Sequence, residues 1–243
     1  MRWLKFLLLS FFLCGSVSAE TEFADSWSKT KKRSAKFVYF DHHETFYCGC
    51  TYESRGASGG VPDHTSCSFE NRPGISNTRA TRIEWEHIVP ASLMPARQHE
   101  CWTGNGRKEC EKNGPEHVKM MIFDLHNLVP SVGQVNADRS NRRYGLLPNR
   151  ELPFGQCPFK YDTGLGLAEP SEEVRGDVAR AWFYMRDRYG VVFADGEEVM
   201  FQTWHEEDPV SDWEKERNVR IFCAQGTSNP HVDAGIIVCP GAP

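Results

Sequence analysis

The sequence has no apolar run long enough to cross a membrane. The run from Phe6 to Leu13 falls short of the ~20 residues that a spanning helix needs, and no other stretch is apolar enough. Basic residues are not in excess either, because 28 lysines and arginines face 33 aspartates and glutamates, for a net charge of −5. This balance argues against a protein that coats nucleic acid, but not against an enzyme with a local basic patch.

Several motifs with well-understood chemistry are also missing. No C-x-x-C pair occurs, and Cys48 and Cys50 are spaced too closely for a zinc site. There is no H-E-x-x-H motif of metalloproteases and no P-loop. Internal repeats, low-complexity runs and long heptad patterns are absent, so we expect a single domain over residues 20–243 and a monomer.

The N-terminus predicts export. Arg2 and Lys5 precede the apolar run, and small residues follow it up to Ala19, as in a secretory signal peptide over residues 1–19. The mature chain then begins at Glu20. We expect it in the periplasm or in the medium, with no membrane attachment.

Cysteine content agrees with export. Cys14 falls in the leader, and the eight that remain are an even number, which favours disulfide bonds in an exported chain. Proximity in the sequence favours the pairs Cys101–Cys110 and Cys223–Cys239, while the other pairings stay open. The eight cysteines are Cys48, Cys50, Cys67, Cys101, Cys110, Cys157, Cys223 and Cys239.

Three helices have N-terminal capping signals and are expected over residues 131–141, 171–190 and 211–226. The first and the third begin with a capping box, in which Ser131 or Ser211 is followed three residues later by Gln134 or Glu214. The second begins at Ser171, continues with apolar residues at spacings of three and four, and ends at a glycine, as does the third.

Three other segments have clear compositional signals. Residues 49–80 and 145–170 are rich in glycine and proline and are expected to be irregular loops. The basic segment Ser28–Lys36 is more typical of a solvated helix face than of a nucleic-acid-binding arm.

Two apolar stretches have a histidine at their middle and a proline at their end. They are Arg82–Pro90 and Asp124–Pro130, and each predicts a strand. The capped helix over residues 131–141 follows the second. Two strands and a helix that clasp one divalent cation make a ββα-metal motif. We therefore expect an α+β fold, a mixed α/β single domain around this motif that is disulfide-stapled and rich in loops.

Residues suited to phosphodiester cleavage lie in this block. His87 is the candidate general base, because a neutral imidazole accepts a proton near pH 7. Glu86 and Asn136 are candidate oxygen ligands for one divalent cation, Mg²⁺ first and Mn²⁺ or Ca²⁺ as alternatives. Arg107 is the candidate phosphate clamp, because its guanidinium matches the geometry of a phosphate.

Each of these assignments has a plainer competitor. A histidine among apolar residues is usually structural, and Asn136 and Arg107 could be ordinary helix and surface residues. Adjacent strand residues also face opposite sides, so Glu86 and His87 share a site only if the backbone bends or if His87 reaches a water beyond the metal. The match of all four residue types to one reaction, in one ordered block, favours a site.

Four motifs in this order resemble the endonuclease I family of periplasmic or secreted bacterial nucleases. They are Arg82–His87, Cys101–Trp102 with Gly106–Lys108, Asp124–Leu128, and Gly133–Asn136 with Asp138–Asn141. Phe46–Cys50 upstream and Gly226 with Asn229–Pro230 downstream extend the resemblance over nearly all of the mature chain.

The resemblance implies a ββα-metal nuclease that hydrolyses DNA, and also RNA, with little sequence preference and leaves 5′-phosphate ends. By position it makes His87 the base, Glu86 and Asn136 the metal ligands, and Arg107 a phosphate-stabilising residue. Further residues that it points to are Arg139, Arg142 and Arg143 for contact with the DNA backbone, and His126 and Asn127 for a supporting or structural role.

One position departs from the family pattern. Close relatives carry a glutamate two residues before the aspartate of the Asp124–Leu128 motif, where this chain has Ile122. The group that orients His87 is then Asp124 or a backbone carbonyl. The departure bears on catalytic efficiency more than on the type of reaction.

Two other functions are weighed against the nuclease. One is a different exported hydrolase such as a metalloprotease, which the missing H-E-x-x-H motif disfavours. The other is a non-catalytic, disulfide-stapled binding protein on the same fold, which the presence of all four site residues disfavours. Metal-dependent cleavage of DNA distinguishes the nuclease from both.

Overall fold

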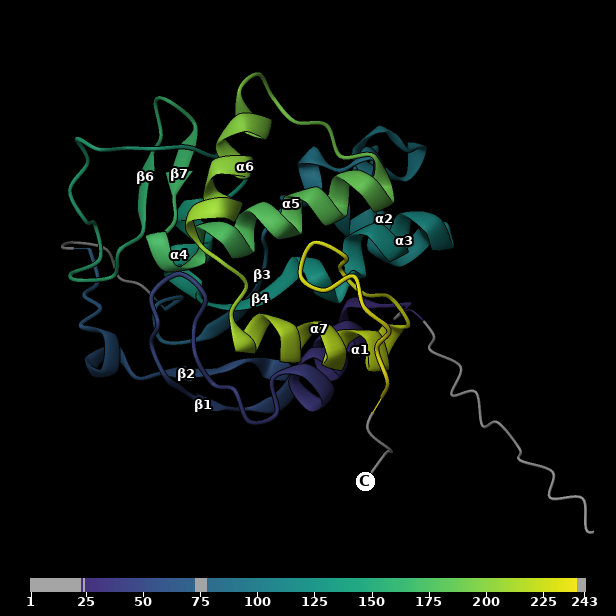
Figure 1. The fold of residues 1–243 in the computed structure, drawn as a ribbon, viewed down its shortest axis with the longest axis horizontal. Helices are drawn as coiled ribbons and strands as arrows, with labels where there is room; N and C mark the ends of the chain where they lie inside the picture. The colour runs from purple at the N-terminus through teal and green to yellow at the C-terminus, as the bar shows by residue number, and fades with distance from the viewer. Residues whose placement is uncertain (1–22, 24, 73–77, 240–243) are drawn as a thin grey trace, which may run out of the picture.

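An antiparallel pair of strands followed directly by a helix forms the centre of the fold (Figure 1). The computed structural model describes residues 23, 25–72 and 78–239, so the predicted leader lies outside the described residues. β3 (Ile83–His87) pairs with β4 (Leu128–Val132), with His87 opposite Leu128, and α4 (Gly133–Arg139) follows β4 without a loop. The predicted ββα arrangement and mixed α/β class are confirmed.

Helices and two small sheets surround this centre. In the view of Figure 1, α5 lies on one side of β3 and β4 and α7 on the other, beside α1. The remaining helices are α1 (Trp27–Arg33), α2 (Arg107–Asn113), α3 (Glu116–Phe123), α5 (Arg175–Tyr189), α6 (Glu197–Glu207) and α7 (Asp212–Gln225). The small sheets are β1 (Tyr52–Ser54) with β2 (Gly60–Pro62), and β5 (Arg143–Tyr144), β7 (Leu167–Glu169) and β6 (Lys160–Asp162) in that order. Among the described residues, none of the helices has the length and apolarity to span a membrane.

The core is built against α5 and the central strands. The apolar face predicted for this helix is confirmed, because Val178, Trp182 and Met185 are fully buried. Phe159 and Phe201 are fully buried in the same cluster. Every residue of β4 is buried, so the strand has no solvent-facing side.

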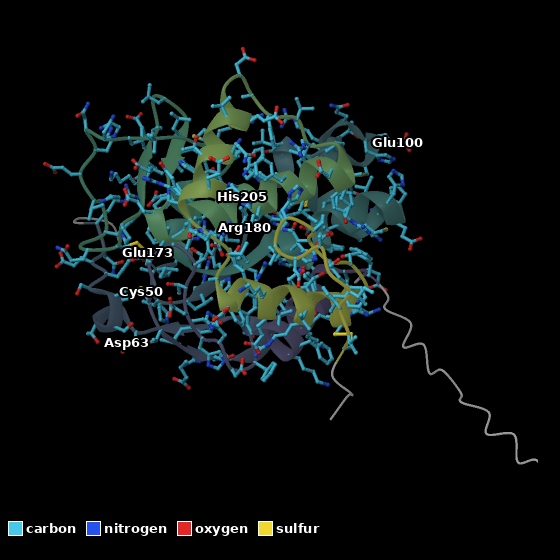
Figure 2. The ribbon with its side chains drawn as sticks, viewed as in Figure 1. Cys50, Asp63, Glu100, Glu173, Arg180 and His205 are labelled. Atoms are coloured by element: carbon cyan, nitrogen blue, oxygen red, sulfur yellow. A yellow bond between two sulfur atoms is a disulfide. The ribbon has the colours of Figure 1, made fainter. Side chains whose placement is uncertain are left out.

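A buried ion pair joins α5 to α7. Arg180 donates to Glu214 from Nε and Nη2, at 2.6 and 2.7 Å, and both side chains are almost fully buried. Nη1 of Arg180 also reaches the Asp208 carbonyl at 2.8 Å and lies 3.2 Å from Nδ1 of His205, next to Arg180 in Figure 2. One guanidinium thus ties the end of α6 to both long helices.

Of the capping signals predicted for the second and third helices, the capping box of the third is confirmed and the N-cap of the second is not. The capping box of α7 is confirmed: Ser211 Oγ accepts from the backbone of Glu214, whose side chain accepts from the backbone of Ser211, and Gly226 ends the helix with φ of 80°. Gly190 ends α5 as predicted, with φ of 74°. Its beginning differs, because Ser171 starts only a 3₁₀ turn with no side-chain cap, and α5 begins at Arg175.

The capping box predicted at Ser131 is wrong. Ser131 lies in β4 opposite Glu84, because pairing with β3 occupies the backbone of this segment. The helix begins at Gly133, where a Cβ atom would come within 2.5 Å of the Arg79 carbonyl, and it ends at Arg139. Only glycine fits this close approach at the junction of strand and helix.

The two predicted loop segments contain short strands. β1 and β2 lie within residues 49–80, and β6 and β7 within 145–170, so the expectation of wholly irregular structure is wrong there. β1 pairs with β2 and β6 with β7, each across a turn, and β7 also pairs with β5, which lies before the segment; composition does not reveal these pairings. The basic segment is helical as expected, with α1 followed by a π-helical turn over Ser34–Val38.

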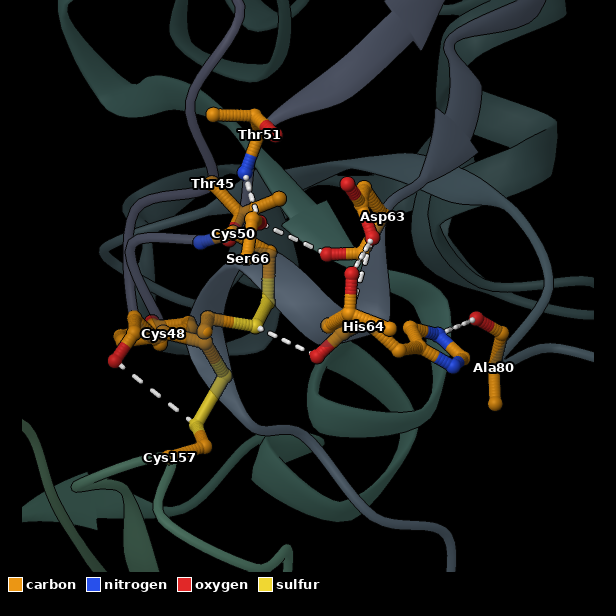
Figure 3. The surroundings of a disulfide bond; sticks show 12 residues. Thr45, Cys48, Cys50, Thr51, Asp63, His64, Ser66, Ala80 and Cys157 are labelled. Atoms are coloured by element: carbon orange, nitrogen blue, oxygen red, sulfur yellow. Dashed lines mark hydrogen bonds between the residues drawn. A yellow bond between two sulfur atoms is a disulfide. The ribbon is translucent and has the colours of Figure 1, made fainter.

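All eight cysteines among the described residues form disulfides. Cys101–Cys110 and Cys223–Cys239 pair as predicted. The two pairings left open are Cys48–Cys157 and Cys50–Cys67, which lie side by side in Figure 3. The first of these joins residues 109 positions apart and so restrains most of the domain.

Candidate active site

The four residues predicted to carry the chemistry lie together. Glu86 and His87 come from β3, Asn136 from α4 and Arg107 from the first position of α2. Two neighbouring hollows, with volumes of about 330 and 240 Å³, both have these four residues in their walls. The central ββα arrangement thus supplies three of the four, and α2 brings Arg107 to the same accessible place on the surface.

His87 is held in one tautomer. Its Nε2 lies 2.7 Å from the Ile122 carbonyl oxygen, which can only accept, so Nε2 carries the proton. Nδ1 is therefore the unprotonated nitrogen, and it lies 3.4 Å from Nη1 of Arg107. Burial, with the neighbouring charge of Arg107, lowers the pKa of His87 to about 3. His87 is thus neutral at physiological pH, the form that a general base needs.

The orienting partner of His87 is the backbone carbonyl of Ile122 and not Asp124. The Asp124 carboxylate accepts instead from the hydroxyl groups of Tyr184 and Tyr189, at 2.8 and 2.7 Å, and from Gln225. These partners lie on α5 and at the end of α7, so Asp124 is committed to packing. The Ile122 side chain is fully buried, and its carbonyl serves the histidine without a carboxylate.

Glu86 is almost fully buried beside the base. Its Oε1 accepts from Arg139 Nη1 at 3.0 Å and from the Tyr47 hydroxyl at 3.3 Å. Burial raises the pKa of Glu86 to about 7, against the lowering effect of Arg139. Both of these side-chain hydrogen bonds reach the same oxygen, so Oε2 has no side-chain partner among the described residues.

The strand alternation of Glu86 and His87 is compatible with a shared site. Glu86 is bonded to Arg139 of α4 and His87 to Ile122 of α3, so the two side chains do have partners on different elements. β3 ends at His87, and both side chains border both hollows at this strand end.

Asn136 is oriented by a carboxylate that the sequence argument did not select. Its Nδ2 donates to Glu84 Oε2 at 3.2 Å, so its Oδ1 faces away from Glu84. Glu84 is itself held by Nε of Arg79 at 3.0 Å and Nε of Arg82 at 2.8 Å. The available signal was strand alternation, because Glu84 is two residues before Glu86 and shares its face.

Arg107 presents its guanidinium at the edge of the site. The side chain is 37% exposed and pairs with Glu111 one helical turn later at 2.9 Å. Its Cζ lies 5.6 Å from the ring centre of Trp27, a second residue that the sequence argument did not select. The Cys101–Cys110 disulfide closes the segment from which Arg107 projects.

The expectation that Arg139 contacts DNA is corrected. Its side chain is fully buried, and its guanidinium donates to Glu86 and to the backbone carbonyls of His87 and Ile88. A group with no exposed surface cannot reach a phosphate. Arg139 instead fixes the end of β3, which carries the base.

Arg142 and Arg143 are half-buried and lie outside the walls of the two hollows. Arg142 donates to Thr163 Oγ1 at 3.1 Å, and Arg143 pairs with Glu197 at 2.5 Å. Their contact with the DNA backbone stays a prediction.

Neither His126 nor Asn127 borders the two hollows, and the supporting role of His126 stays a prediction. Asn127 bonds the backbone N–H and carbonyl of Val89, at 2.7 and 3.0 Å, and so holds the segment just after His87. His126 Nε2 lies 2.8 Å from the Thr227 carbonyl, and burial lowers the pKa of His126 to about 4.

The oxygen donors fit a hard divalent cation that keeps several water ligands. Among the described residues, no group of three or more His, Cys, Asp or Glu side chains is arranged to hold a metal. The site instead offers one carboxylate, that of Glu86, and one amide oxygen, that of Asn136, whose Nδ2 is bound to Glu84. One or two protein ligands are what Mg²⁺ usually takes.

A serine-hydrolase motif is present only as a sequence pattern. Gly56–Gly60 reads G-A-S-G-G and so matches G-x-S-x-G. In an α/β-hydrolase this pattern forms a sharp turn from a strand into a helix. Here it forms a 3₁₀ turn between the antiparallel strands β1 and β2, which is not a nucleophile elbow.

Comparison with known proteins gives one consistent result. The family model described as Endonuclease I matches residues 21–235. An Endonuclease-1 of Buchnera aphidicola subsp. Acyrthosiphon pisum is 41% identical over 82% of this chain and 78% of its own length. An extracellular deoxyribonuclease of Aeromonas hydrophila is 39% identical over 93% of this chain and 96% of its own length. A periplasmic deoxyribonuclease of the same organism is 36% identical over 95% of this chain and 94% of its own length.

Proposed function

This chain belongs to the endonuclease I family, and from this premise we propose that it is an exported, metal-dependent endonuclease with little sequence preference and with His87 as its general base. Membership makes it a nuclease of the hydrolase class. Relatives named extracellular and periplasmic place it outside the cytosol, in one of those two compartments. The proposed substrate is DNA, with RNA as a second substrate because the site residues are suited to the phosphodiester that both contain.

The tautomer of His87 carries the proposal. Nε2–H is bound to the Ile122 carbonyl, so the lone pair of Nδ1 faces the hollow, where it accepts from Nη1 of Arg107 at 3.4 Å until that guanidinium binds a phosphate. A water beside Nδ1 can lose its proton to this nitrogen as it attacks phosphorus. The imidazolium that forms keeps its Nε2–H bond to the carbonyl, which stabilises the added charge.

Arg107 and the oxygen donors act on the phosphate. The Arg107 guanidinium binds non-bridging oxygens of the phosphate. It lies on the side from which the water attacks phosphorus. Glu86 and Asn136 would hold one divalent cation, Mg²⁺ first, with Mn²⁺ or Ca²⁺ as alternatives, and it would neutralise charge on the phosphate and the leaving oxygen. Departure of the 3′ oxygen leaves a 5′-phosphate end, the product that we propose.

The competing function is a disulfide-stapled binding protein that has lost catalysis. A supercoiled-plasmid assay on the mature, oxidised protein separates the two. Nicking with Mg²⁺ that EDTA abolishes, with 5′-phosphate ends on the products, supports the nuclease. Binding of the plasmid without cleavage under any divalent cation, by folded and fully disulfide-bonded protein, supports the binding protein.

A further inference from the structure

One of the two hollows at the site has a cationic side chain with no partner among the described residues. Lys31 of α1 borders the 330 Å³ hollow together with Trp27 and Ser58. Glu84 and the two arginines bound to it also border this hollow. Lys31 is half-buried, and its ammonium group forms no hydrogen bond or ion pair with any residue in the described part of the chain. A half-buried ammonium without a counter-charge is suited to an anionic ligand.

The other basic groups at the site have protein partners. Arg79 and Arg82 are bound to Glu84, and Arg107 is paired with Glu111. Among the basic side chains at this hollow, Lys31 is therefore the most available to bind an anionic ligand.

The second hollow has a different character. Beyond the four shared residues and the buried Arg139, its walls are Pro90, Ala91, Ser92, Trp102, Ser140 and Asn141. None of these six side chains is charged. The site therefore has a positive side toward α1 and a neutral side toward the segment after β3.

A nucleic-acid strand has a negative charge on every nucleotide. Its phosphates are therefore attracted to the positive side of the site and not to the neutral side. If the scissile phosphate is at His87 and Arg107, the strand continues into the hollows on either side of them. A volume of about 330 Å³ is at the lower end of the range for small-ligand sites.

We propose that the hollow on the α1 side is a subsite for the nucleotide next to the scissile phosphate, and that Lys31 binds the phosphate of that nucleotide. This proposal rests on the proposed function, because it takes the scissile phosphate to be at His87. It makes α1 part of the substrate-binding surface, although its sequence alone is more typical of a solvated helix face.

The experiment measures the salt dependence of DNA binding, which counts phosphate contacts. Protein carrying His87→Ala, with Mg²⁺ present, is titrated against a short fluorescent DNA duplex between about 50 and 200 mM salt. Lys31→Gln and Lys32→Gln are each added to this background. Both remove one charge from α1, but Lys32 is exposed and does not border either hollow.

The slope of log K against log salt should become shallower by about 0.9 in Lys31→Gln, the amount for one lost contact to duplex DNA, and stay unchanged in Lys32→Gln. Equal slopes in the two variants would overturn the subsite, and so would absence of measurable binding by the His87→Ala parent. Because binding is read without cleavage, failure of the protein with His87 intact to cut DNA would count against the proposed function alone.

Discussion

The ring of Trp27 stacks on the ring of His87. The two ring centres lie 5.4 Å apart and the planes are within 13° of each other. Trp27 also contacts Phe123 and lies under the Arg107 guanidinium. The first helix of the described chain thus forms a wall of the candidate site and fixes the face on which the base sits.

Loss of this wall should impair turnover. We expect Trp27→Ala to lower kcat by about 10- to 100-fold, because a small displacement of a catalytic group has effects of this size. Trp27→Phe retains a ring and should stay within a few-fold of the parent. Steady-state kinetics on DNA measure both. An unchanged kcat in Trp27→Ala would show that stacking does not matter.

Glu84 should act through Asn136. We expect Glu84→Gln to lower the apparent affinity for Mg²⁺ in cleavage by about 10- to 100-fold. The reason is that the substitution weakens the hydrogen bond that orients the Asn136 amide. The measurement is a Mg²⁺ titration of activity. Glu53→Gln on β1, which is exposed, is the matched control and should titrate like the parent. If Glu84→Gln also titrates like the parent, Glu84 has no part in the metal site.

Arg139 should matter for stability and not for phosphate contact. Removing one partner of a buried ion pair leaves the other charge unpaired, so Arg139→Ala should lower the free energy of unfolding by about 3–5 kcal/mol. Urea denaturation measures this change. A variant as stable as its parent, with a shallower salt dependence of DNA binding, would restore the surface role that the sequence suggested.

Stability should fall in mild acid partly through His126. Its pKa is about 4 in the folded protein and about 6.5 in an unfolded chain. Above pH 6.5 the imidazole is neutral in both states. Between pH 6.5 and 4 only the unfolded state takes up the proton, so the folded state loses stability, by about 3 kcal/mol in total.

His126→Gln removes this titration and should flatten the acid side of the stability profile. Denaturant unfolding at several pH values gives the comparison. Parallel profiles for the two proteins would mean that His126 titrates alike in the folded and unfolded states.

The Cys101–Cys110 disulfide should matter more for activity than for stability. It closes a short segment, so replacing both cysteines with serine should reduce the free energy of unfolding by about 2–3 kcal/mol. It also frees the start of α2, and we expect a larger effect on kcat/KM because Arg107 projects from there. The same double replacement at Cys48 and Cys157, with a separation of 109 residues, should cost more stability. Unchanged kcat/KM without Cys101–Cys110 would show that the bond does not position Arg107.

The sequence was sufficient for the central motif because its signals are local. The two apolar stretches with a histidine at their middle became β3 and β4, and the residues grouped from them lie together. Disulfides close in sequence were predictable for the same reason. Ser131 shows the limit: its capping pattern is sound, but pairing with β3 over a long sequence separation decides its structure.

The residues that were missed depend on contacts distant in sequence. Trp27 is 60 positions from His87, and no periodicity connects them. The resemblance to the family pointed to Arg139 as a DNA contact, yet its guanidinium is buried among three acceptors around the end of β3. Ile122 shows a third case, since the carbonyl of any residue type can orient a histidine.

The most direct test of the central claim is the rate at which His87→Ala cuts supercoiled plasmid in Mg²⁺. General-base catalysis contributes about 10²–10⁴-fold, so the variant should lose at least this much activity. Its circular dichroism, its disulfide content and its affinity for DNA should stay close to those of the parent. Cleavage by folded His87→Ala at the parent's rate would contradict the assignment of His87 as the base.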